Sequence, residues 1–323
     1  MRRPGSISTT AFAYAAMGRA MPRHARARVA TALLALLLAT GCSRQAPPPA
    51  TPPATPAIPR LVSLAPNLTE LICAVGGANR LVGRTDVCNY PSNLIANIPI
   101  VGGFGRPYLE PLLNQQPTLV LDVALEDKSI GAALDRLGIA RRQIACQRLD
   151  DIPRAARLIG QLAGHPADGE ALARHLADGI RTRRNTVNQT PAAQRPTVYV
   201  ELWDMTAGRN SFVAELVALA GGRNIGDELT QDYVTVSTEW LLQRDPDLII
   251  CLYPGALRTQ YAATNKKLGW AALRAVQAGR VYSDFTIDTI LRPGPRVLEG
   301  IEQLRQVMTA VPPATTTTLA QPK

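Results

Sequence analysis

The fold of this chain is decided by a stretch that occurs twice. The first copy is LEPLLNQQPTLVL at residues 109–121, and the second is TEWLLQRDPDLII at residues 238–250. Each copy predicts a short helix that opens with a carboxylate and stops before a proline, followed by an apolar run of strand length. A second pair, ELICAVGGAN at 70–79 and ELVALAGGRN at 215–224, precedes the first pair in each half. Two pairs in the same order indicate two copies of one βα lobe.

The remaining elements fit an α/β fold with parallel-type sheets. In the first half we expect strands at 60–65, 81–83, near 100, at 118–121 and at 143–146, and helices capped by Asn67 and at 129–137 and 152–163. In the second half we expect strands at 197–202, 248–252 and 281–282, and helices at 212–219, at 237–244 and from the 293–295 turn to about 311. Strands alternate with helices, as they do in parallel sheets.

One long helix is predicted between the two halves. Residues 168–188 contain no proline and no strand pattern, and a helix of about twenty residues spans ~30 Å. Its apolar stripe, which includes Leu176 and Ile180, is narrow. A narrow stripe favours a brace between the lobes over a core helix.

The chain therefore divides into six predicted segments. They are a lipoprotein signal peptide (1–41), a Pro/Ala-rich tether (42–59), an N-terminal α/β lobe (60–166), a bridging helix (167–190), a C-terminal α/β lobe (191–311) and a disordered tail (312–323). We expect a ligand cleft between the two lobes.

The N-terminal segment has the pattern of an export signal. Arginines at 23, 26 and 28 precede an apolar run at 29–39, which is too short to span a bilayer. The following LATGC at 38–42 resembles a bacterial lipobox, which implies that Cys42 is lipidated and that the mature protein is anchored to a membrane in the periplasm. Cleavage to a plain secreted protein is the alternative. Met1, Met17 or Met21 is the start of translation.

The charge does not indicate a nucleic-acid partner. The formal net charge is +10, but six of the 35 basic residues lie before residue 42, where there is no acidic residue. The rest of the chain has 29 basic and 25 acidic residues, without a basic stripe interleaved with aromatic residues.

Cysteines and histidines give no metal-site spacing. The three histidines have no cysteine or carboxylate partner at ligand spacing, so we expect no metal and no cofactor. Beyond Cys42 the cysteines are Cys73, Cys88, Cys146 and Cys251. In an exported chain they favour one disulfide within the first lobe and two free thiols.

Glu110 and Glu239 occupy equivalent places in the two copies. A catalytic carboxylate pair needs a separation of about 5–9.5 Å, which equivalent residues of separate lobes should not have. They are either plain helix N-terminal acids or one docking anchor per lobe.

Four aromatic residues are predicted to lie in loops: Tyr90, Phe104 and Trp203 follow strand signals, and Tyr233 precedes the helix that begins near Glu239. Loops beyond the carboxyl ends of parallel strands line ligand crevices, so these residues are candidate ligand contacts. Core packing is the alternative for each of them, and we expect it for Trp270.

Several motifs together resemble the ABC-transporter solute-binding proteins with a helical backbone, and within them the cobalamin-binding branch. They are SLAPNLTE at 63–70, DVCNYP at 86–91, VGGF at 101–104 and RPGPR at 292–296. The resemblance covers about residues 60–311. It implies two α/β lobes joined by one long helix, a ligand held between them, and no enzymatic reaction.

The resemblance also implies roles for individual residues. Tyr90, Phe104, Trp203 and Tyr233 would contact a corrinoid, and Asp288 and Arg292 would reach its polar edge. Glu110 and Glu239 would meet arginines of a permease dimer that works with a cytoplasmic ATPase. Phe104 and Tyr233 stand where cobalamin binders of this kind carry tryptophan, so the ligand is less determined than the fold.

Other ligands and other functions are alternatives to this one. A ferric siderophore or haem is the alternative ligand, but an anionic siderophore needs converging basic residues, and the sequence offers only Arg106 and Arg292. An exported hydrolase that uses Glu110 and a structural lipoprotein are the other readings. A shallow cleft that has a few aromatic walls and few charges suits a flat, largely apolar ligand such as cobalamin.

Overall fold

The computed structural model describes residues 59–253 and 269–311. These residues belong to one compact unit that begins at Ile58. The predicted signal peptide, Cys42, the tether up to residue 58 and the 312–323 tail lie outside the described residues. No helix within the described ranges is both long and apolar enough to cross a membrane.

The first lobe is built on a four-stranded sheet with the order β2-β1-β5-β6, in which all neighbours are parallel. Its strands are β1 (Leu61–Ser63), β2 (Leu81–Arg84), β5 (Leu119–Asp122) and β6 (Ala140–Gln143). Its helices are α2 (Pro66–Ala74), α3 (Ser92–Ile95), α4 (Leu109–Asn114), α5 (Lys128–Arg136) and α6 (Asp151–Ala163), with a 3₁₀ turn at Ala78–Arg80. Strands β3 (Gly102–Gly103) and β4 (Arg106–Pro107) form a small antiparallel hairpin.

The second lobe is built on a four-stranded sheet with the order β12-β11-β7-β9, again with parallel neighbours. Its strands are β7 (Thr197–Glu201), β9 (Arg223–Asn224), β11 (Leu248–Cys251) and β12 (Val281–Tyr282), and β8 (Thr206–Ala207) pairs with β10 (Tyr233–Val234) beside them. Its helices are α8 (Phe212–Leu219), α9 (Thr238–Arg244), α11 (Arg274–Gln277), α12 (Ile287–Leu291) and α13 (Val297–Thr309). Short 3₁₀ turns lie at Ala192–Gln194, Ile225–Glu228 and Trp270–Ala272.

The strand orders confirm the duplication predicted from the sequence. If the small hairpins are set aside, each lobe's strands in chain order are first, second, third and fourth. The first sheet is then arranged second–first–third–fourth, and the second sheet, read as β9-β7-β11-β12, has the same arrangement. The repeated stretches occupy α4–β5 and α9–β11 in the two lobes.

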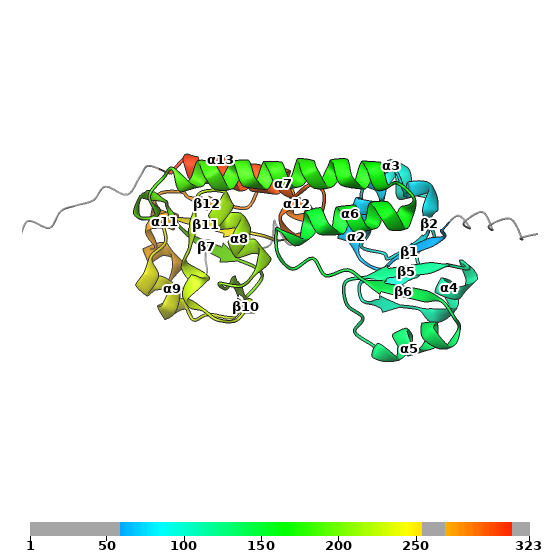
Figure 1. The fold of residues 1–323 in the computed structure, drawn as a ribbon. Helices are drawn as coiled ribbons and strands as arrows, with labels where there is room; N and C mark the ends of the chain where they lie inside the picture. The colour runs from blue at the N-terminus through cyan, green and yellow to red at the C-terminus, as the bar shows by residue number, and fades with distance from the viewer. Residues whose placement is uncertain (1–58, 254–268, 312–323) are drawn as a thin grey trace, which may run out of the picture. The chain divides into compact units, whose positions relative to one another are not determined.

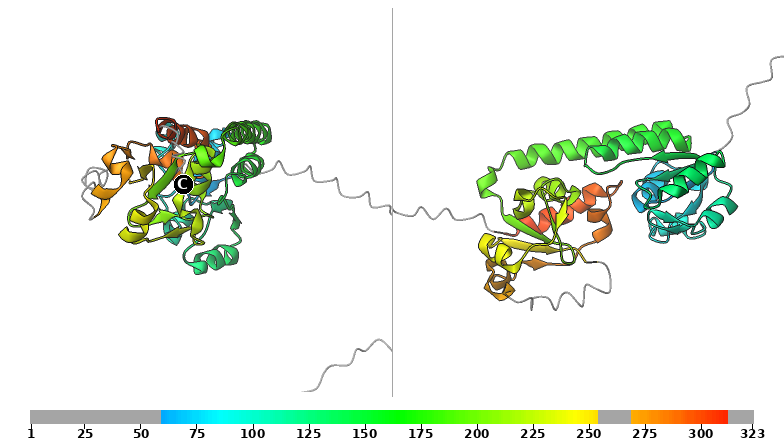
Figure 2. Two further views of the ribbon diagram at one scale, coloured as in Figure 1. Left: turned by 90° about the vertical axis from the view of Figure 1, so that its left-hand side faces the viewer. Right: turned by 90° about the horizontal axis from the view of Figure 1, so that it is seen from below.

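The predicted long helix is α7 (Pro166–Asn188), and it contacts both lobes. It packs on α6 of the first lobe and on α8 and α13 of the second (Figures 1 and 2). Leu176 and Ile180 of the predicted stripe are buried, together with Gly169 and Ala173. The helix begins slightly before the predicted range because Pro166 suits its first turn.

Each sheet is covered on both faces, because alternate residues of its strands enter different clusters. Val62 on β1 and Ile249 on β11 each belong to a small hydrophobic cluster whose members all come from one lobe. Their neighbours Leu61 and Ile250 enter one large cluster that also contains Leu176 of α7. Burial on both faces accounts for the apolar runs that identified these strands.

Two local predictions were wrong, and one helix was not predicted. Strand β6 ends at Gln143, and the apolar residues Ile144 and Cys146, which suggested a strand at 143–146, are buried in a crossing segment. Asn67 does not cap α2: the N-cap position is Ala65, and the Asn67 amide donates to the Pro293 carbonyl at 3.3 Å. Helix α12 was not expected.

Candidate functional site

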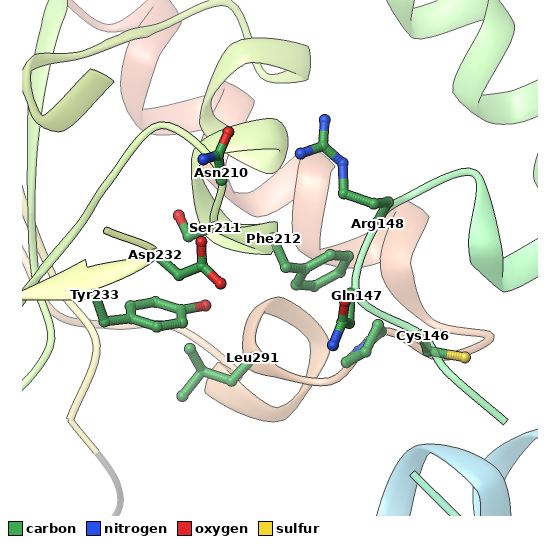
Figure 3. Close-up of a pocket in the computed structure, with 10 residues that line it drawn as sticks. Cys146, Gln147, Arg148, Asn210, Ser211, Phe212, Asp232, Tyr233 and Leu291 are labelled. Carbon is green, nitrogen blue, oxygen red and sulfur yellow. The ribbon is translucent and has the colours of Figure 1, made fainter. Parts of the chain in front are cut away.

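A cavity of about 510 Å³ lies where the segment after β6 approaches the start of α8 (Figure 3). Its wall includes residues from both lobes. Among them are Gln147, Arg148, Ser211, Phe212, Asp232 and Tyr233. Its volume falls within the range of about 300–1,000 Å³ that is typical of small-molecule pockets.

The backbone fixes the polar residues of the cavity. The Gln147 and Arg148 backbone N–H groups donate to the carboxylate of Asp151 at the start of α6, at 3.0 and 2.8 Å. Ser211 caps α8, because its Oγ accepts from the backbone N–H of Ala214 at 3.2 Å. These local bonds place the residues before any ligand arrives.

Tyr233 on strand β10 and Asp232 directly before that strand both line the cavity. The pairing of Tyr233 with Ala207 on β8 and the bond from the Gly208 N–H to the Asp232 carbonyl, 2.8 Å, hold this edge. Figure 3 shows both side chains turned toward the space in front of Phe212. Burial, followed by the charge of Asp232, raises the pKa of the Tyr233 phenol, so it remains a neutral hydrogen-bonding group.

All four candidate aromatic residues are on the surface. Tyr90 is 44% exposed, Phe104 48%, Trp203 38% and Tyr233 42%. The core-packing alternative is therefore wrong for them. It is confirmed for Trp270, which is buried and lies edge-on to Tyr199 with ring centroids 6.2 Å apart.

Their positions relative to the cavity differ. Tyr233 lines the cavity, whereas Tyr90 follows β2, Phe104 lies in the turn between β3 and β4, and Trp203 follows β7. Trp203 has a positive φ of 59°, in the short turn that Leu202 and Met205 close. Their role as ligand contacts stays a prediction.

Asp288 and Arg292 have partners in the protein. Arg292 forms an ion pair with Glu70 at 3.0 Å and another with Asp288 at 3.0 Å. Asp288 accepts from the Asn89 amide at 3.1 Å. Only 12% of the Arg292 side chain is exposed, and its proposed contact with a ligand edge stays a prediction.

Glu70 is the buried centre of this network and was missed as a site residue. It is 2% exposed and also accepts two hydrogen bonds from Arg296, at 2.8 and 2.9 Å. A buried carboxylate needs such partners to be stable. The sequence places Glu70 and Glu215 at the same point of the repeat, which was the available signal.

Glu215 makes the equivalent contact from the other lobe. It pairs with the Arg148 guanidinium and accepts from the backbone N–H of Leu149 at 2.7 Å. Each lobe therefore presents a carboxylate at the same place in α2 or α8, and each receives arginine from the segment that follows the last strand of the other lobe.

The basic residues at the cavity differ from those expected. Arg148 lines it, whereas Arg106 forms an exposed ion pair with Glu126 on the β4 side of the first lobe. The nearby glycine-rich segment at residues 102–106 forms a β-hairpin. It therefore does not lead into a helix N-terminus, as a phosphate-binding loop would.

Glu110 and Glu239 lie in the first turns of α4 and α9, as predicted, and both are exposed. Bonds to the Glu239 backbone and to Ser237 lower the pKa of the Glu239 carboxyl, so it is ionised. Their docking role stays a prediction.

The expected disulfide is absent. Cys73, Cys88, Cys146 and Cys251 are all free and buried. Burial raises the pKa of Cys146 to about 12, and its sulfur points away from the cavity in Figure 3. Within the ranges that the structure describes, no group of three His, Cys, Asp or Glu side chains is placed to hold a metal ion.

Comparison with known proteins agrees with this architecture. A family model described as periplasmic binding protein matches residues 61–284. The vitamin B12-binding protein of Vibrio cholerae is 26% identical over 76% of this chain and 87% of its own length. An uncharacterized ABC transporter substrate-binding lipoprotein of Bacillus subtilis, YvrC, is 24% identical over 76% and 79%.

Among solved structures, the periplasmic heme-binding protein RhuT from Roseiflexus sp. RS-1 in its apo form is similar, with a TM-score of 0.70 and 26% identity. The match covers 77% of this chain and 97% of that one. The chain has two parallel sheets of one topology, a long helix that contacts both, and a family match over most of the described residues. It therefore belongs to the periplasmic binding protein family, as an ABC-transporter substrate-binding protein.

Proposed function

We propose that this protein is a lipid-anchored solute receptor that captures cobalamin between its lobes and delivers it to an inner-membrane ABC permease. The observation that carries this proposal is the cavity with walls from both lobes, together with four exposed aromatic side chains: Tyr233 of β10 at the cavity, and Tyr90, Phe104 and Trp203 in loops. Aromatic rings bury flat apolar ligand surface efficiently. The likeness to vitamin B12-binding proteins supports the choice of ligand.

Haem is the second candidate, and a specific observation favours it. Arg148 lines the cavity with half of its side chain exposed, so its guanidinium, although it pairs with Glu215, would also meet a carboxylate on a ligand's edge. A solved relative is named as a heme-binding protein. Asp232 faces the same cavity, and its negative charge opposes an anionic edge, so cobalamin remains the preferred ligand.

Titration separates the two ligands. The purified protein is titrated with cyanocobalamin, haemin and a panel of ferric siderophores, with calorimetry and tryptophan fluorescence as readouts. We expect saturable 1:1 binding of cyanocobalamin without turnover. If haemin binds more tightly than cyanocobalamin, haem becomes the proposed ligand. Chemical change of any ligand would contradict the receptor function.

Paired substitutions test whether the cavity is the site. Tyr233→Ala removes a ring from the wall, whereas Tyr233→Phe keeps the ring and removes only its hydroxyl. We expect the alanine variant to lose about tenfold in affinity and the phenylalanine variant to stay close to wild type. Equal losses would indicate that the hydroxyl, rather than the ring surface, is recognised.

The anchor is tested separately. Cys42→Ala in the full chain should abolish labelling by a radioactive fatty acid and move the protein from the membrane fraction to the soluble periplasmic fraction. Unchanged fractionation and labelling would contradict lipidation at Cys42.

A further inference from the structure

The ring of Tyr90 is held by an arginine from the second half of the chain. The guanidinium carbon of Arg296 lies 3.9 Å from the centroid of the Tyr90 ring. A cation over the ring face is an attractive arrangement. One face of the ring is thus occupied by protein, while 44% of the residue stays exposed.

Arg296 is in turn fixed by Glu70. Two parallel hydrogen bonds join its Nε and Nη2 to the Glu70 carboxylate, at 2.9 and 2.8 Å. Only 12% of the Arg296 side chain and 2% of Glu70 are exposed. A bidentate pair shielded from water leaves the guanidinium little freedom, so the orientation of the ring depends on the carboxylate.

The same carboxylate fixes the rest of the loop through Arg292. Arg292 donates to the Glu70 carboxylate, and it also donates to the Asn89 side-chain oxygen at 2.7 Å and to the Val87 carbonyl at 3.2 Å. The Asn89 amide donates to Asp288 at 3.1 Å. Three residues of the loop, Val87, Asn89 and Tyr90, are therefore held by contacts with residues 288–296.

We infer that Glu70 is a positioning residue for ligand binding: it holds Arg292 and Arg296, and they hold the Tyr90 ring and its loop ready to stack on a planar ligand. The inference rests on the proposed function, because it takes Tyr90 as a ligand contact. A ring that is already fixed loses little rotamer freedom when a ligand arrives, so binding is tighter.

A purely structural ion pair is the competing explanation, and the chain offers a matched control for it. Asp122, buried on β5, forms a bidentate pair with Arg141 on β6 at 2.7 and 2.8 Å, with no contact to the Tyr90 loop. Asp122→Asn and Glu70→Gln each remove one buried, arginine-paired carboxylate charge from the first lobe.

Hydrogen exchange tests the positioning without any ligand. Backbone amides of residues 85–90 should exchange at least tenfold faster in Glu70→Gln and Arg296→Met than in wild type, and at the wild-type rate in Asp122→Asn. Equal acceleration in Asp122→Asn, or wild-type exchange in both network variants, would overturn the inference.

A double-mutant cycle with cyanocobalamin as the probe tests the link to binding. Arg296→Met should weaken binding about tenfold and have no further effect on a Tyr90→Ala background, and Arg296→Lys should recover part of the loss. Additive losses would show that Arg296 acts independently of Tyr90 and would refute the positioning role. The cycle is repeated with haemin.

The two ideas fail in different ways. If wild type binds neither cyanocobalamin nor haemin but the loop loosens only in the network variants, the ligand assignment is wrong and Glu70 still positions the loop. If wild type binds and the cycle is additive, the proposed function stands and the inference about Glu70 is wrong.

Discussion

The crossing of α6 and α7 offers a stability prediction that can be worked from the coordinates. Helix α6 carries Gly160 and α7 carries Gly169, and both are buried. A Cβ added at Gly160 would lie 2.6 Å from the Cα of Gly169 and 2.8 Å from the carbonyl oxygen of His165. These are backbone atoms, which cannot rotate away. The two helices therefore approach as closely as they do because glycine faces glycine.

The expected magnitude is the difference between two effects. Gly→Ala inside a helix favours folding by about 1 kcal/mol. Overpacking costs about 1–3 kcal/mol, and backbone contacts place this site near the upper end. Gly160→Ala should thus lower the free energy of unfolding by about 2 kcal/mol.

Gly131 in α5 supplies the control. It is also helical and buried, but an added Cβ would meet nothing closer than the Arg141 Nη1 at 3.5 Å, an ordinary contact with a movable side chain. Gly131→Ala should raise the free energy of unfolding by about 1 kcal/mol. Urea unfolding followed by circular dichroism measures both variants. If Gly160→Ala is as stable as Gly131→Ala, the close crossing of α6 and α7 is refuted.

Three further predictions concern the docking carboxylates, the buried cysteines and the acid dependence of stability. Charge reversal of Glu110 and Glu239 should abolish uptake of the ligand in cells while leaving the measured affinity for cyanocobalamin unchanged; a lost affinity would contradict their docking role. In a Cys42→Ala chain, native protein at pH 8 should react slowly with a thiol reagent and denatured protein should show four thiols, because burial raises the pKa of groups such as Cys146 to about 12; fewer than four would reveal a disulfide. Burial alone would raise the pKa of Asp151, but the backbone N–H groups of residues 147–148 and the nearby arginine lower it overall. The stabilising effect of Asp151 is therefore present above its ordinary pKa and is lost in acid as pH falls through the lowered folded-state pKa. Asp151→Asn should remove that part of the acid dependence of unfolding, and an unchanged profile would contradict the assignment.

The duplicated architecture could be predicted because its signal is local. The apolar strands are continuous runs, and each repeat unit carries its own helix stop and strand start, so the topology follows from two matched stretches. The exposure of Tyr90 and Trp203 followed from the rule that loops after parallel strands face the ligand side of the sheet.

What failed depends on contacts between distant parts of the chain. Ile144 and Cys146 look like strand residues because they are apolar, but they are buried while the chain crosses toward the other lobe. From the sequence alone, Glu70 is an ordinary acidic residue near the start of a helix. Its arginine partners lie more than 200 positions later in the chain, so the local pattern gives no sign of them. Periodicity reads only neighbours in sequence, so it could not identify these pairs.

The exchanged arginines have a consequence for how this chain can be divided. Glu70, which is buried, pairs with Arg292 and Arg296, and Glu215, which is partly exposed, pairs with Arg148, so each half supplies the counter-charge for a carboxylate of the other half. Although the two halves share one topology, we expect that neither half folds on its own. A fragment that ends after α6 would keep Glu70 in its α2 helix with no cation beside it, and we expect such a fragment to fail as a folding unit.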